Sequence, residues 1–340
     1  MKKILLVTTL VVFVVQCYAQ QIFLQRNGKV QKVYASTDLQ SAVDDAQDGD
    51  KVYFTQGSFS KANGNSAIRV DKKISFVGCG AESKTGKSNG ADYTLCDYKF
   101  DFCFENSTQL SDKLFDNIRL NGQISFNDDY NQDLGGLRFR KCYFAYDILY
   151  GKKTLKDVTF DRCKLSNNYN RLPSNLLQLT MRNCYITILR GCISDASNCN
   201  LINCNIGRIY GRSLNFSDNG DEFQGVLTNC IVGNFANPSS KNYFSASCKL
   251  NYVLYPGTKE NAVKAQYDEN AIYPYSGSLN LLELSGAKLA EYVGSDGKVV
   301  GYLGGKNPYT LKNSLPEVTS SSVHWDTKNK KIELDIKVNQ

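Results

Sequence analysis

Histidine and tryptophan are almost missing from this 340-residue sequence, which has one of each beside 21 tyrosines and 17 phenylalanines. Imidazole is the usual general base near neutral pH and a common metal ligand, so this scarcity excludes most histidine-dependent catalysis and His-rich metal sites. Proline is also scarce, with six residues, and the 26 glycines follow no three-residue period. These features exclude collagen-like and proline-rich disordered chains and predict an ordered globular body.

Long hydrophobic runs are absent apart from the segment Ile4 to Val15. Two lysines precede this segment, and Cys17 and Ala19 place small residues at the −3 and −1 positions of a cleavage site. The pattern predicts a secretory signal peptide over residues 1–19, with the mature protein secreted, periplasmic or on the cell surface. The alternative is a lipoprotein acylated at Cys17. No segment reaches the ~18 apolar residues of a membrane helix, so no transmembrane segment is expected.

The charge pattern argues against two classes of partner. The formal net charge of +7 is small for the length and far below that of a nucleic-acid-binding tract. Ala81 to Ser88 matches a permissive phosphate-binding loop, but a loop-like Asn-Gly-Ala-Asp stretch follows where that motif needs a helix. Neither nucleic acid nor a nucleotide is expected to bind.

The cysteines form a repeat. Removal of residues 1–19 leaves eleven of the twelve cysteines, an odd number that cannot all pair. No close-spaced Cys-x-x-Cys pairs indicate zinc, and mostly free thiols are expected. Six cysteines recur at intervals of 21, 21, 20, 26 and 18 residues: Cys142, Cys163, Cys184, Cys204, Cys230 and Cys248.

The residues around each cysteine predict a corner between two short strands. Apolar residues recur three places before the cysteine in five repeats and two places after it in all six, the last being Leu250. A straight strand cannot bury both sets, so a bend must fall at the position before the cysteine. Asparagine tolerates the left-handed conformation such a bend requires better than other non-glycine residues. The bend positions are Lys141, Arg162, Asn183, Asn203, Asn229 and Ser247.

A repeat of about twenty residues with short strands predicts a solenoid whose coils bury their apolar sides against each other. Residues 36–48 predict a short amphipathic capping helix, with Thr37 and Gln40 at capping-box spacing. The predicted organisation is a signal peptide over 1–19, a parallel β-helix with its N-terminal cap over 20–255, and last coils with a C-terminal tail over 256–340. Within that tail, Val323 to Val338 predicts a strand pair, and the tail is expected to cover the far end of the solenoid.

STDLQSAVDDAQDGDKVYF, IRVDKKISFVGCG and the repeated Asn-Cys corners resemble secreted bacterial proteins of the pectin-lyase-like superfamily. The resemblance covers roughly residues 36–255 and implies an all-β fold, a right-handed parallel β-helix solenoid. It also implies polysaccharide as the class of ligand. The catalytic patterns of such enzymes are incomplete here, because the lone His324 lies in the tail and an Arg-x-Pro-x-x-Arg pattern beginning at Arg171 ends in Leu176.

The function expected from these features is non-catalytic binding of an acidic polysaccharide or cell-surface glycan. A divergent polysaccharide lyase or glycoside hydrolase and an adhesin-like surface protein are the alternatives. Outward positions around the corner supply arginine forks for carboxylates and tyrosine rings for sugars. They could equally form a mutually neutralised strand exterior. The candidate residues are Arg138, Arg140, Tyr143, Asp161, Lys164, Arg182 and Tyr185.

One acidic cluster invites a metal hypothesis. Asp218, Asp221 and Glu222 fall in the longest interval between cysteines, where an extruded loop could hold Ca²⁺ through carboxylate and carbonyl oxygens. The alternative is a solvated turn, which Asn, Asp and Gly form on their own. No other cofactor is expected.

Overall fold

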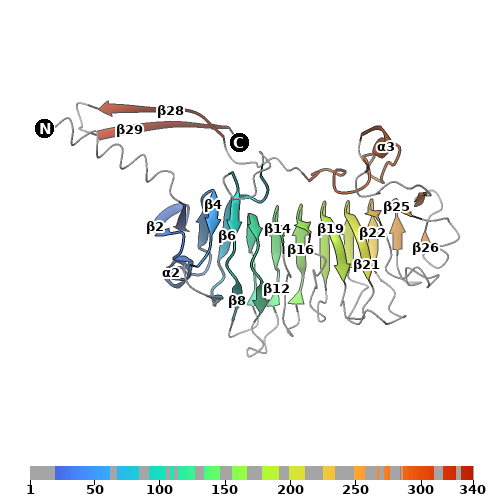
Figure 1. Ribbon diagram of the computed structural model, residues 1–340, viewed down its shortest axis with the longest axis horizontal. Helices are drawn as coiled ribbons and strands as arrows, with labels where there is room; N and C mark the ends of the chain where they lie inside the picture. The colour runs from blue at the N-terminus through green and yellow to red at the C-terminus, as the bar shows by residue number, and fades with distance from the viewer. Residues whose placement is uncertain are drawn as a thin grey trace.

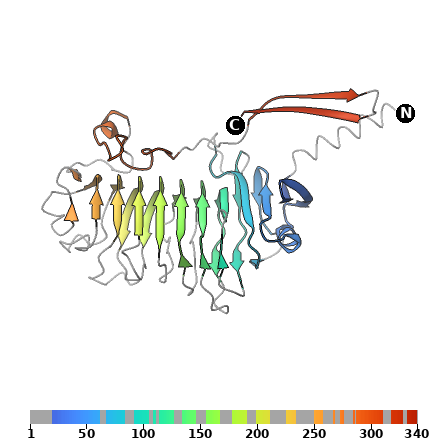
Figure 2. The same cartoon turned by 180° about the vertical axis from the view of Figure 1, so that it is seen from behind.

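The computed structural model describes residues 20–61, 67–83, 92–104, 108–110, 114–126, 134–145, 155–166, 178–190, 199–210, 225–233, 249–256, 266–267, 272–275, 284, 286–309, 317–326 and 331–339. It shows a mostly β protein built as a parallel β-solenoid, as the repeat predicts (Figures 1 and 2). None of the helices in these ranges is long and apolar enough to cross a membrane.

Two parallel sheets run the length of the solenoid, and β10 (Phe115–Leu120) bends so that its halves belong to both. Sheet A contains β3 (Lys51–Phe54), β6 (Ser75–Gly80), β13 (Arg138–Arg140), β16 (Val158–Asp161), β18 (Leu179–Arg182), β20 (Cys199–Ile202), β22 (Val226–Thr228), β24 (Lys249–Asn251) and β26 (Gln266–Tyr267). Sheet B contains β4 (Gly57–Phe59), β7 (Thr94–Cys96), β14 (Tyr143–Phe144), β17 (Lys164–Leu165), β19 (Tyr185–Arg190), β21 (Asn205–Tyr210), β23 (Ile231–Val232), β25 (Val253–Pro256) and β27 (Ile272–Tyr275).

Shorter strands close a third side in the first coils. One three-stranded sheet joins β5 (Ile68–Val70), β8 (Phe100–Phe102) and β11 (Ile124–Phe126). Another joins β9 (Thr108–Gln109), β12 (Leu134–Gly135) and β15 (Leu155–Lys156). Their pairing is parallel, so each coil stacks on the next in the same direction.

The corner between sheets A and B is a left-handed residue, as predicted. Asn183 and Asn203 have φ of 51°, Asn229 has φ of 55°, and Lys141 and Arg162 adopt the same conformation despite their longer side chains. A single left-handed residue reverses which side of the strand faces inward. The apolar residues before and after the corner therefore both reach the core, as the sequence pattern required.

The predicted sixth corner is wrong. Tyr252, with φ of 55°, makes the turn there, and pairing of Leu227 with Leu250 places Leu250 before the corner. Val253 takes the inward position that the cysteines fill in earlier coils, because Ile231 pairs with Leu254. That position requires only a small apolar side chain, so alignment on cysteine chose the wrong register. Ser247 and Cys248 lie outside the described residues.

Phenylalanine rings stack along the axis of the solenoid. Phe76, Phe115, Phe139 and Phe160 are ladder partners from successive coils, and all four are at most 1% exposed. Centroids of adjacent rings lie 5.1, 6.0 and 4.8 Å apart, with interplanar angles of 19°, 6° and 14°. Aromatic pairs of this kind contribute about 0.5–1.5 kcal/mol each beyond the area they bury.

The cysteines form an inward ladder of thiols, as predicted. Cys142, Cys163, Cys184, Cys204 and Cys230 are free and at most 1% exposed. Each thiol lies near the carbonyl oxygen two residues before it, with Sγ–O distances of 3.2–3.5 Å. The thiol thus gives that carbonyl a weak hydrogen bond at the corner.

We expect these thiols to resist modification in the native protein. Burial raises the pKa of Cys163, Cys184 and Cys204 well above the ordinary thiol value, which lowers the concentration of reactive thiolate. A small disulfide reagent should label them at least about tenfold more slowly in buffer than in denaturant. Mass spectrometry of labelled peptides measures each rate, and fast native labelling of most of the five would contradict the inward ladder.

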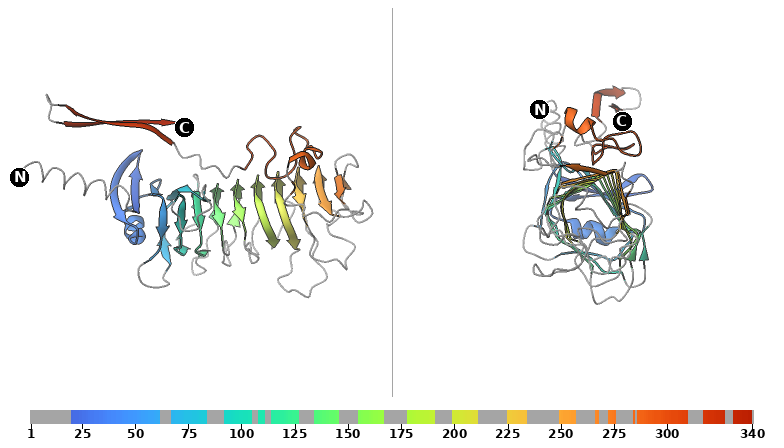
Figure 3. Two further views of the ribbon diagram at one scale, coloured as in Figure 1. Left: turned by 45° about the horizontal axis from the view of Figure 1, so that its top comes forward. Right: turned by 90° about the vertical axis from the view of Figure 1, so that its right-hand side faces the viewer.

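The N-terminal cap forms, with one difference from prediction. Helix α2 (Leu39–Asp45) buries Leu39, Ala42 and Val43, and in the end-on view of Figure 3 it lies across the core. An antiparallel pair, β1 (Gln21–Arg26) and β2 (Lys29–Ala35), precedes it. The predicted capping box is wrong, because no side chain caps the helix. Gln40 instead bonds the backbone nitrogen and oxygen of Arg69 on β5.

The C-terminal tail has two parts. The predicted strand pair is confirmed by β28 (Glu317–Asp326) and β29 (Lys331–Asn339), which pair antiparallel. Residues 286–309, which begin with α3 (Gly286–Ala290), do not cover the far end of the solenoid as expected. They run back along one side of it, from the coils of β25 toward its middle (Figures 1 and 3). We call residues 286–309 the strap.

Candidate functional site

The outer side of sheet A carries the charged ladder that the sequence predicted. Pairing between neighbouring coils aligns Arg138 with Thr159 and Thr180, and Arg140 with Asp161 and Arg182. The Arg140 column therefore alternates in sign from coil to coil. Opposite charges on neighbouring strands stabilise a sheet by about 0.2–1 kcal/mol per pair.

Two charged residues of this ladder are held by other groups. Arg140 forms a bidentate ion pair with Asp116 of β10, whose side chain is only 10% exposed. That hydrogen bonding raises the pKa of Arg140. The Asp161 carboxylate accepts hydrogen bonds from the Arg162 guanidinium, with an Nη2–Oδ2 distance of 2.6 Å. Arg140 and Asp161 are thus part of the framework that holds the corner.

Arg138 and Arg182 are exposed cations of the same side. Arg138 has a side chain that is 50% exposed and only a loose contact, at 3.6 Å, with the exposed Asp157. Arg182 is exposed, and no ion pair to it is found among the described residues. An exposed pair at this distance contributes about 0–1 kcal/mol, so a ligand displaces it at little cost.

Beyond Arg182 the outer side of sheet A is largely polar. Successive coils present the at least partly exposed Asn200, Thr228 and Asn251, together with the partly exposed Ile202 and Val226 and the exposed Lys249. Hydroxyl and amide groups donate and accept hydrogen bonds, as sugar hydroxyls do. Sheet A therefore offers an extended, largely polar strip that begins with two exposed arginines and ends near the exposed Lys249.

Tyr143, Lys164 and Tyr185 lie on a different side of the molecule, on sheet B around the corner. They are partners of one another in the ladder, as the spacing predicted. The Arg119 guanidinium lies 4.3 Å from the Tyr143 ring centre. All three are half-buried. The seven candidate residues thus split into two sets, and the structure does not bring the tyrosines to the arginines.

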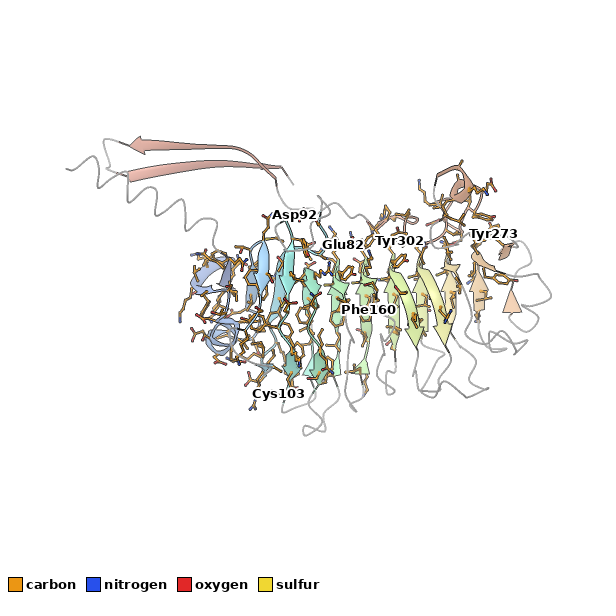
Figure 4. The ribbon with its side chains drawn as sticks, viewed as in Figure 1. Glu82, Asp92, Cys103, Phe160, Tyr273 and Tyr302 are labelled. Atoms are coloured by element: carbon orange, nitrogen blue, oxygen red, sulfur yellow. The ribbon has the colours of Figure 1, made fainter. Side chains whose placement is uncertain are left out.

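Other parts of the chain pack against the sheet B set. Lys164 Nζ lies 2.7 Å from Oε1 of Glu82, which follows β6, and the Tyr302 ring of the strap meets Tyr185 edge-on at 5.7 Å. Figure 4 shows Glu82 and Tyr302 along the same edge of the solenoid. The pKa of buried Tyr309 is raised by its burial and by the nearby Glu82 carboxylate.

The strap is fastened to the corner asparagines. Asn183 Nδ2 donates to the carbonyl oxygens of Tyr302, at 3.2 Å, and Gly304, at 2.7 Å. The Ser295 nitrogen donates to Oδ1 of Asn229, at 2.9 Å. The corner asparagines therefore serve twice, because their backbone makes the turn and their amides bind the strap. No sequence signal identified these contacts, since the partners are 66 to 121 residues apart.

The calcium hypothesis has no structural test here. Asp218, Asp221 and Glu222 all lie outside the described residues. Within the described ranges, no group of three or more His, Cys, Asp or Glu residues could hold a metal ion. Arg171 and Leu176, the incomplete lyase pattern, also lie outside those ranges.

No protein-family model and no curated protein matches this chain. The parallel solenoid itself agrees with the fold that the resemblance implied. A fold of this kind hosts many activities, so function has to be argued from the two outer sides of the corner.

Proposed function

We propose that this protein is an exported β-helix protein, related to the pectin-lyase-like superfamily, that binds an acidic polysaccharide without cleaving it. The binding surface is the outer side of sheet A. The observation that carries the proposal is the exposure of Arg138 and Arg182 on the same outer side of sheet A, in two neighbouring ladders, while Arg140 and Asp161 are held by the framework. The segment 1–19 supplies the expected export signal.

The geometry suits an extended polymer. Arg138 aligns with Thr180 two coils on, and Arg182 lies two residues beyond Thr180 on the same strand. The two arginines are therefore roughly 10 Å apart along the solenoid axis and roughly 7 Å apart along the strand direction. A guanidinium binds a carboxylate through two parallel hydrogen bonds, which a lysine does not provide. A chain with regularly spaced carboxylates can occupy both arginines and continue over the polar strip.

The carboxylates of this side support binding over cleavage. Glycoside hydrolysis uses a pair of carboxyl groups that approach the sugar from opposite sides of the bond. Asp116 and Asp161 are each engaged by an arginine, and the more exposed Asp157 lies 3.6 Å from Arg138. These three carboxylates all lie against arginines, which supports holding a polymer over cutting it.

The test is a double variant, Arg138→Gln with Arg182→Gln. We expect its affinity for polygalacturonate to fall about tenfold at low salt, because two exposed charge-assisted contacts are lost, and to differ less at high salt. Affinity is measured by retention on immobilised polymer across a salt series. Lys29→Gln with Lys288→Gln removes the same charge from exposed positions elsewhere and should leave retention unchanged.

Arg140 is left intact in this design, because its loss would remove both hydrogen bonds that it donates to the poorly exposed Asp116. Such a change costs about 2 kcal/mol and would mix folding with binding. Equal retention of the double variant and the wild type would exclude the sheet A surface. Release of unsaturated sugar products by the wild type would show that the protein is a lyase and not a non-catalytic binding protein.

A further inference from the structure

The outer side of sheet B carries a cation between two rings. Lys164 Nζ lies 5.2 Å from the ring centre of Tyr143 in the preceding coil and 5.8 Å from that of Tyr185 in the following one. Tyrosine rings offer flat apolar faces to a sugar, and an ammonium attracts a carboxylate. We call Tyr143, Lys164 and Tyr185 the sheet B triad.

Both the Lys164 ammonium and a tyrosine ring of the triad already contact other groups of this chain. The Glu82 carboxylate lies 2.7 Å from Lys164 Nζ, and the Tyr302 ring meets Tyr185 at an interplanar angle of 70°. The triad is therefore already engaged with one carboxylate and one ring. An acidic sugar unit carries the same two features, a carboxylate and a ring with apolar faces.

We propose that the triad is a second binding site, for a uronic-acid unit of the polysaccharide, and that residues 302–309 of the strap are its removable cover. The class of ligand rests on the proposed function. When the cover lifts, the sugar ring replaces Tyr302 at Tyr185, and the sugar carboxylate displaces Glu82, which lies outside the cover, from Lys164. Lys164 selects the acidic unit, and the two tyrosines align it with the coils.

The strap is fastened in two different ways along its length. Its first part is anchored by apolar packing, with Val300 in one buried cluster with Leu254. The beginning of the cover is held by hydrogen bonds from Asn183 to the backbone of Tyr302 and Gly304, by one from the Tyr302 nitrogen to Asn205, and by the Tyr302 ring against Tyr185. The end of the cover is held by the buried Tyr309. Hydrogen bonds exchange with water at small net cost, whereas exposing apolar surface costs more. The cover can therefore open at residues 302–305 while the anchor and Tyr309 stay in place.

Gly305→Ala should displace the cover. Gly305 has φ of +77°, and a Cβ built there would overlap the side-chain amide of Asn203. Because Asn203 is only 7% exposed and has little room to turn away, we expect this part of the strap to move off the corner. Gly297→Ala is the matched control. It lies in the same strap with φ of +72°, and a Cβ there meets nothing within 4 Å. The two variants share the backbone strain and differ in the overlap.

Two measurements on the full chain detect whether the cover opens. Acetylation of Lys164 by a small anhydride, read by mass spectrometry, should be at least about fivefold faster in Gly305→Ala than in the wild type. Trigalacturonate should bind that variant at least about threefold more tightly in calorimetry, because a competing internal contact is removed. Adding Lys164→Gln should abolish this gain, and Gly297→Ala should behave like the wild type.

Either measurement can overturn the proposal. Equal acetylation in both glycine variants and the wild type would show that the cover does not lift. Faster acetylation without tighter trigalacturonate binding would show that the triad is no sugar site. The sheet A surface is judged separately, by retention of the Arg138 and Arg182 double variant on long polymer. If Gly305→Ala does not fold, Tyr302→Ala, which removes the covering ring and leaves the corner intact, carries the same expectations.

Discussion

Phe139→Ala is expected to lower the free energy of unfolding by about 3–5 kcal/mol, as large-to-small changes in a packed core do. Phe139 is 1% exposed and stacks between Phe115 and Phe160 of the adjacent coils. It also meets Phe144 edge-on at 5.5 Å. Because coils support only their neighbours, a cavity at this point weakens the contact between the two halves of the solenoid.

Urea unfolding followed by circular dichroism measures the effect. Leu303→Ala is the control, since Leu303 is 41% exposed and its truncation should change stability by less than about 0.5 kcal/mol. A second transition in the Phe139→Ala curve would show that the halves now unfold separately. A loss below about 1 kcal/mol would contradict the stacked column of rings.

Asn183→Val is expected to cost about 3 kcal/mol or more. Its φ of 51° is a conformation that a β-branched residue adopts only at a cost of about 1–3 kcal/mol. Valine also removes the two hydrogen bonds that the Asn183 amide donates to the strap. Each such bond contributes about 0.5–1.5 kcal/mol.

Asn183→Gly separates the two causes. Glycine adopts the corner conformation freely but lacks the amide, so it should lose only the contribution of the hydrogen bonds. Amide hydrogen exchange at residues 302–304 should rise in both variants, while the stability of the solenoid should fall mainly in the valine variant. Similar unfolding free energies for the two variants would show that the corner does not require a left-handed residue.

The sequence predicted the corner because its requirements are local. Inward positions must be apolar on both sides of Cys163 and Cys184, and only a residue that reverses the strand satisfies both sets. The prediction failed at Tyr252, where valine replaces cysteine at the inward position and the spacing no longer marks it. It also missed the earlier corner at Asn117, where buried Ile118 takes the inward position.

The candidate site was predicted only in part. The alternation of inward and outward positions along each strand identified which residues point outward, and the ladder pairing of Arg140, Asp161 and Arg182 follows from it. This alternation does not show what packs on the outside. The contacts of Lys164 with Glu82 and of Tyr185 with Tyr302 join segments 82 and 117 residues apart, and they depend on how the chain folds back on itself.

The left-handed corners divide the solenoid into repeated units of one coil each. Each interval from one corner to the next is a complete unit, so loss or duplication of one whole interval leaves every other side chain on its original side. A shift of one residue within a strand would turn core residues outward, whereas the corner intervals of 20 to 26 residues show that the segments between the strands absorb other changes of length. The strap restricts this freedom, because it is bonded to Asn183, Asn205 and Asn229 in three consecutive coils. Coils outside that region can therefore be gained or lost over evolution, whereas those beneath the strap must keep their number.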